Sequence, residues 1–134
     1  MFTLHLAITW MTVGLIWVIQ IIVYPQFRRV GEAEFRNYHF AHCLRIGLMI
    51  APLMLLEMGS AAWLYFQGLN SLPFVISLAM FPVIILSTAI LQAPLHTKLM
   101  QGRDDAAIQK LVRTNWLRTI AWSARGILLC FAAD

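Results

Sequence analysis

The sequence predicts an all-α fold, a single domain in which four helices form an antiparallel transmembrane bundle. Of the 134 residues, 60% are hydrophobic and only 12% are charged, which is outside the range of soluble globular chains. Four stretches reach or approach the roughly 20 apolar residues that a helix needs to cross a bilayer. These stretches are residues 2–24, 46–66, 72–95 and 116–133. A chain of this length supports one domain and no more.

The distribution of basic residues predicts the topology. All Lys and Arg residues but Arg125 flank the first or the third connection between the spans, and the second connection carries no charge. The positive-inside rule then places connections one and three in the cytoplasm and both termini outside, in a multi-pass protein of the bacterial inner membrane. The basic residues that give the net charge of +4 are placed where this membrane topology requires them. We therefore expect membrane lipid as a partner and no nucleic acid.

Local signals place the helix boundaries. The second helix should begin near Glu32, project into the cytoplasm and bend at Pro52. A short loop then joins it to the third helix, so these two form a tight antiparallel hairpin. Asp104 or Asp105 should be the N-cap of a fourth helix of up to about 30 residues, roughly 45 Å long.

Polar residues from three helices should meet near the cytoplasmic end of the bundle. His42 and His96 lie almost equally far from the middle of the second loop, so an antiparallel hairpin brings them to the same depth. Other members follow from helical spacing. His39 lies one turn from His42, Gln92 shares a face with His96, Asn115, Arg118, Trp122 and Arg125 share a face of the fourth helix, and Gln20 of the first helix can reach them.

Three interpretations of this cluster fit the sequence. The first is an interfacial belt, in which Arg and Lys hold lipid phosphates. The second is a redox site, in which His39, His42 and His96 ligate a transition metal, or one of them ligates a haem. The third is a basic pocket for an anionic or quinone-like amphiphile. Its donors would be Arg45, Asn115 and Arg118.

Glu57 and Arg125 form a second constellation, because both lie more than two helical turns inside their spans. A mutual ion pair is the simple interpretation, since an unpaired charge there is costly. The alternative makes Glu57 a proton acceptor. We expect His5 to be exposed at the outer surface. Cys43 and Cys130 should lie near opposite membrane faces without a disulfide, and Cys43 is expected to be a buried thiol, with metal binding as the alternative.

A family resemblance rests on short motifs across most of the chain. They are WVIQIIVYPQF, YHFAHCLRI, LQAPLH, TNWLRT and the spacing of Pro52, Met54 and Glu57. With these motifs the chain resembles the anthrone-oxygenase-like membrane proteins, small bacterial four-helix proteins whose last helix carries an N-x-x-R pattern, here Asn115 and Arg118. It is more loosely similar to the four-helix haem-binding protoporphyrinogen oxidase. The histidines of that oxidase do not line up here, so haem ligation does not carry over. The resemblance implies oxidation of a hydrophobic, polycyclic or quinone-like substrate.

The sequence therefore predicts a small inner-membrane oxidoreductase or oxygenase-like protein that acts on a hydrophobic small molecule. Its catalytic or ligating groups would be His39, His42, His96 and Glu57. The substrate or cofactor would be anchored by Arg45, Gln92, Asn115, Arg118 and Arg125. The alternative is a non-enzymatic binding protein or small transporter with Glu57–Arg125 as a gating pair. A transporter would need a homo-oligomer, because four helices seldom enclose a solute path.

Overall fold

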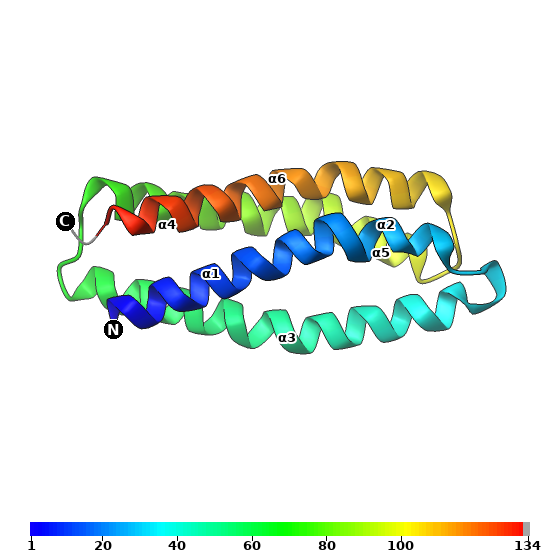
Figure 1. Cartoon of the computed structure of the whole chain (residues 1–134), viewed down its shortest axis with the longest axis horizontal. Helices are drawn as coiled ribbons and strands as arrows, with labels where there is room; N and C mark the ends of the chain where they lie inside the picture. The colour runs from blue at the N-terminus through cyan, green and yellow to red at the C-terminus, as the bar shows by residue number, and fades with distance from the viewer. Residues whose placement is uncertain (133–134) are drawn as a thin grey trace.

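The computed structural model describes residues 1–132, and every regular element within them is helical. Four helical segments run up and down along the bundle (Figure 1): Phe2–Arg29, Glu32–Phe66, Leu72–Leu99 and Asp105–Cys130. The first and third connections lie together at one end, and the N-terminus and the last turn of the fourth segment lie at the other (Figure 1). The all-α, four-helix prediction is confirmed. The orientation of the bundle in a membrane stays a prediction.

Two of the segments contain a wide π-helical turn. The first segment consists of α1 (Phe2–Val18), the π turn Ile19–Val23, α2 (Tyr24–Gln26) and a 3₁₀ turn (Phe27–Arg29); the third consists of α4 (Leu72–Ser87), the π turn Thr88–Gln92 and α5 (Ala93–Leu99). Proline is the second residue of both α2 and α5 (Pro25 and Pro94). A proline ring clashes with the carbonyl four residues earlier, so the wider turn makes room for it. Such turns recur at functional sites.

The other helix boundaries follow the local signals. The helix α3 (Glu32–Phe66) begins at the expected residue and continues as one helix through Pro52. At the start of α6 (Asp105–Cys130), the Asp104 side chain accepts a hydrogen bond of 2.7 Å from the backbone N–H of Ala107 and caps the helix. The Lys98 ammonium beside Asp104 holds the pKa of that carboxyl below its usual range.

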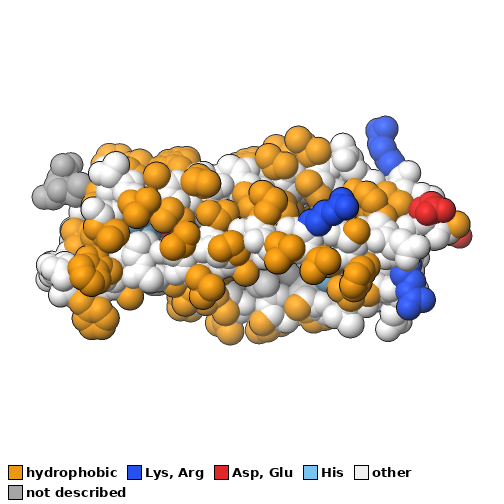
Figure 2. Space-filling view, turned by 90° about the horizontal axis from the view of Figure 1, so that it is seen from below, with side chains coloured by type: hydrophobic (Ala, Val, Ile, Leu, Met, Phe, Trp, Pro, Cys, Tyr) orange, Lys and Arg blue, Asp and Glu red, His pale blue; other side chains and the backbone are white. Residues whose placement is uncertain are grey.

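Three segments are long and apolar enough to cross a membrane: Phe2–Arg29, Glu32–Phe66 and Leu72–Leu99. The expected fourth span, residues 116–133, falls on α6 and ends at Ala133, which lies outside the described residues. Figure 2 shows hydrophobic side chains over most of the visible surface, with charged side chains gathered toward one end. These charges belong to the end that holds the first and third connections. The surface is that of a protein suited to a lipid environment.

The helices are not packed equally. The helix α6 packs along α4 and α1, whereas α3 packs mainly on α1 and touches α5. The core between α1, α4 and α6 contains Ile16, Phe81, Ile84 and Trp122. An open groove of about 660 Å³ lies between α3 and the third segment, from Ile85 near the end of α4 through the π turn to α5.

Candidate functional site

A row of hydrogen-bonded rings crosses the bundle near its charged end. The Tyr24 hydroxyl of α2 lies 3.0 Å from His96 Nε2 of α5, and His96 Nδ1 lies 3.0 Å from His39 Nε2 of α3. The rings of His39 and His96 stack with centroids 5.2 Å apart. His96 follows the π turn Thr88–Gln92 by four residues. Three separate helices therefore build one chain of proton-carrying groups.

Cys43 completes this group, one helical turn after His39 on α3. Its sulfur lies 3.8 Å from His39 Nε2 and 3.7 Å from His96 Nδ1. The set His39, Cys43 and His96 offers three potential metal-ligand atoms within 4.8 Å of one another. The sequence favoured a plain buried thiol for Cys43. The i, i+4 spacing of His39 and Cys43 could have indicated in the sequence that the two side chains share a site.

His42 lies beside this group without joining it. Its ring centroid is 6.2 Å from those of both His39 and His96, and it packs edge-on against Phe27. The expected approach of His42 to His96 is therefore found, but His39 and Cys43 make the closer contacts. His42 Nε2 is buried and has no hydrogen-bond partner among the described residues.

A polar relay from the π turn Ile19–Val23 and α6 holds Arg118 in place. The Gln20 amide N–H donates to the backbone carbonyl of Val112 (3.1 Å), and Asn115 Nδ2 donates to Gln20 Oε1 (2.8 Å). Arg118 Nη1 then donates to Asn115 Oδ1 over 3.3 Å. The backbone carbonyl fixes the direction of every bond in this relay, since it can only accept. The predicted meeting of Gln20, Asn115 and Arg118 is confirmed.

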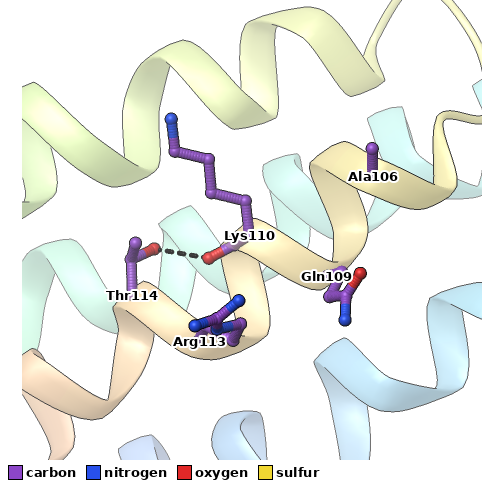
Figure 3. Close-up of a pocket in the computed structure, with 5 residues that line it drawn as sticks. All are labelled: Ala106, Gln109, Lys110, Arg113 and Thr114. Atoms are coloured by element: carbon purple, nitrogen blue, oxygen red, sulfur yellow. Dashed lines mark hydrogen bonds between the residues drawn. The ribbon is translucent and has the colours of Figure 1, made fainter.

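Gln92 is held in one amide orientation. The Thr114 hydroxyl donates to the backbone carbonyl of Lys110 over 2.8 Å (Figure 3), so its oxygen is left to accept from Gln92 Nε2, also at 2.8 Å. The free atom of Gln92 is therefore its carbonyl oxygen Oε1, which is buried without a partner among the described residues. Lys110 and Arg113 are exposed on this stretch of α6 and suit an interface with lipid headgroups.

Residues of the hydrogen-bonded ring row and of the Gln20–Asn115–Arg118 relay line one groove, between α3 and the third helical segment. Its apolar wall includes Ile46, Ile50 and Met54 of α3 and Ile85 of α4, and its polar lining comprises Tyr24, Cys43, Thr88, Gln92, His96, Thr97 and Arg118. Arg118 Nε, like Gln92 Oε1, is buried and has no partner within residues 1–132. The groove is thus mostly apolar, and two residues of its lining carry buried polar atoms without a partner among the described residues.

The expected Glu57–Arg125 ion pair is present at the opposite half of the bundle. Arg125 Nε donates to Glu57 Oε1 over 2.9 Å, and both side chains are fully buried. The hydroxyls of Thr9 and Thr12 lie 2.7 and 3.2 Å from the carboxylate oxygens. The Arg125 guanidinium also stands 3.8 Å over the Phe81 ring. These contacts fit a structural lock between α1, α3, α4 and α6.

His5 belongs to this lock, so the expectation of an exposed histidine is wrong. The side chain is 0% exposed. Arg125 Nη2 lies 3.1 Å from His5 Nε2 and must donate to it, because a guanidinium has no acceptor. His5 Nδ1 then carries the proton and donates to Ser60 Oγ over 2.7 Å. The buried Arg125 guanidinium needs hydrogen-bond acceptors besides Glu57, and this need is the signal that places His5 in the interior.

The remaining predicted site residue, Arg45, does not reach either cluster. Its side chain is exposed on α3, and its position one residue from the groove-lining Ile46 turns it outward. Gln92, Asn115 and Arg118 lie around the groove, whereas Glu57 and Arg125 form the separate lock.

Comparison with known proteins gives no relative: no family model, no curated protein and no solved structure matches this chain.

Proposed function

We propose that this chain is a small multi-pass protein of the bacterial cytoplasmic membrane that oxidises a lipid-soluble quinol held in the groove along α3, with molecular oxygen as the electron acceptor. Three helices suited to span a bilayer and an apolar groove of about 660 Å³ support the membrane setting and the hydrophobic substrate. The positive-inside rule supports a site close to the cytoplasmic face.

The observation that supports this proposal best is that two residues of the groove lining each carry a buried polar atom without a partner among the described residues, Gln92 Oε1 and Arg118 Nε. An unpaired buried donor or acceptor costs about 1–3 kcal/mol, so a ligand that satisfies both gains correspondingly. Thr114, which holds Gln92, lies one helical turn before Arg118 on α6, so the two groups are neighbours. In this proposal a ring hydroxyl donates to Gln92 and accepts from Arg118.

The row of hydrogen-bonded rings supplies the route for protons. Oxidation of a ring hydroxyl removes a proton with each electron, so the site needs a group that accepts protons beside the substrate. Tyr24 and His96 both line the groove and are hydrogen-bonded to each other. In this proposal the Tyr24 hydroxyl relays the protons away from the substrate, and Arg118 stabilises the negative charge that develops on the oxygen. The two electrons and the two protons of the quinol end on molecular oxygen, which leaves as hydrogen peroxide.

Binding of a short-tailed quinol to the purified protein tests the proposal. We expect Arg118→Gln to weaken binding about 10- to 100-fold, because a hydrogen bond to a charged group contributes about 1.5–3 kcal/mol. Gln92→Leu should weaken binding about 2- to 10-fold, because a hydrogen bond between neutral groups contributes about 0.5–1.5 kcal/mol. Arg45→Gln is the matched control, since it removes the same charge from an exposed position. Thermal melts check that all three variants are folded.

Two results would contradict the proposal. Equal quinol affinities of the Arg118→Gln and Arg45→Gln variants would show that Arg118 does not bind the ring hydroxyl of the quinol. Tight binding without any oxidation of the quinol, measured by its absorbance in the presence of oxygen, would favour the non-enzymatic binding protein instead.

A further inference from the structure

We propose that His39, Cys43 and His96 bind one copper ion, with a coordination position open to the groove. The ligand atoms are His39 Nε2, Cys43 Sγ and His96 Nδ1, contributed by α3 and α5. The metal site rests on this geometry alone. The choice of copper also rests on the proposed oxidoreductase function.

The spacing of the three atoms fits a single ion. Nitrogen ligands about 2.0–2.1 Å from a tetrahedral metal lie about 3.3 Å from each other, and a sulfur about 2.3 Å from the metal lies about 3.6 Å from each nitrogen. The observed separations are 3.0 Å between the nitrogens and 3.8 and 3.7 Å from the sulfur to each nitrogen. Shifts of a few tenths of an ångström suffice to complete the triangle around an ion.

The surroundings of the triangle also resemble those of metal ligands. A metal-bound histidine usually engages its other ring nitrogen in a hydrogen bond that fixes the ring. His96 does this, because its Nε2 lies 3.0 Å from the Tyr24 hydroxyl. The buried Nε2 of His42, unpartnered among the described residues, stands beside the triangle. This unpaired nitrogen is a second observation, independent of the triangle, that points to a ligand at this end of the bundle.

The ligand types select the metal. Two imidazoles and one thiolate form the set found around copper in electron-transfer sites, and both ligand types also accept zinc. Cys43 and His96 line the groove, whereas His39 does not. The ion therefore lies between α3 and α5 with one side toward the groove. Binding converts the Cys43 thiol to a thiolate and releases its proton.

Titration with Co²⁺ tests the ligand set by spectroscopy. We expect one Co²⁺ per chain and a near-ultraviolet thiolate-to-cobalt charge-transfer band. Cys43→Ser should abolish this band and weaken binding at least tenfold, while keeping the size of the side chain. Cys130→Ser is the matched control, because this exposed thiol lies at the other end of the bundle. It should leave the band and the affinity unchanged.

The outcomes separate the metal site from the proposed function. A band that survives in Cys43→Ser, or no band in the wild-type protein, would overturn the site. Elemental analysis of protein purified from copper-supplemented cells should find one copper per chain, and zinc in its place would overturn the copper assignment. Quinol binding measured on the same samples reports on the groove independently. Loss of metal binding with intact quinol binding would refute this inference alone.

Discussion

At the scale of single residues, the lock around Arg125 shows what a buried charge requires. An ionised side chain in an apolar span needs a counter-ion and acceptors for its remaining donors. Glu57 is the counter-ion, the Ser77 carbonyl accepts from Nη1 over 2.9 Å, and His5 accepts from Nη2. Each guanidinium nitrogen thus has a partner. This completeness favours a structural role over proton transfer by Glu57.

A double-mutant cycle tests that role. Glu57→Gln and Arg125→Gln should each destabilise the bundle, because each leaves the other charge buried and unpaired. Broken buried pairs cost on the order of 3–5 kcal/mol. The double variant should recover much of the loss, since neither charge remains. Thermal melts in detergent measure all three variants. Additive losses in the double variant would rule out the pair as the source of stability.

At the scale of helical elements, the two π turns place the site residues. Each turn contains a glutamine (Gln20 or Gln92), and each is succeeded within one helical turn by a ring of the hydrogen-bonded row, Tyr24 or His96. A π turn adds one residue to the helix and rotates the residues after it by about 100° relative to an unbroken helix. Each π turn thus determines which face of α2 or α5 the following ring occupies.

Replacing the proline of the second turn tests this dependence. We expect Pro94→Ala to let residues 88–92 relax toward a regular α-helix and turn His96 away from His39. Metal affinity should fall roughly 10- to 100-fold, as it does when the hydrogen-bonding partner that orients a metal ligand is lost. Pro82→Ala is the control, because Pro82 lies inside α4 and outside the π turn. Similar Co²⁺ affinities for the two variants would contradict the role assigned to the turn.

At the scale of the whole molecule, the unequal packing of α3 creates the site. Its contacts with α1 and α5 hold it in place, and the lock joins it to α6 through Glu57 and Arg125. Between these supports α3 leaves the groove open toward α4. The result is a bundle with a tight polar lock in one half and an open polar groove in the other.

Much of this arrangement could be predicted from the sequence, because it depends on periodicity and charge. The start of α3 at Glu32, the Asp104 cap and the Glu57–Arg125 pair follow from local signals and from the cost of burying one charge. The burial of His5 and the inclusion of Cys43 depend on which partners tertiary packing supplies. Each π turn adds one residue to its helix and so changes which residues share a face. A regular period of 3.6 residues does not predict that change.

The central claim is that the groove and the His39–Cys43–His96 triangle form one site. The most direct test is to add a short-tailed quinol to the Co²⁺-loaded protein and follow the cobalt d–d absorption bands. We expect these bands to shift with the same saturation curve as quinol binding, because the open coordination position faces the groove. In the Arg118→Gln variant the shift should require about 10- to 100-fold more quinol. Saturable quinol binding that leaves the cobalt bands unchanged would contradict the claim.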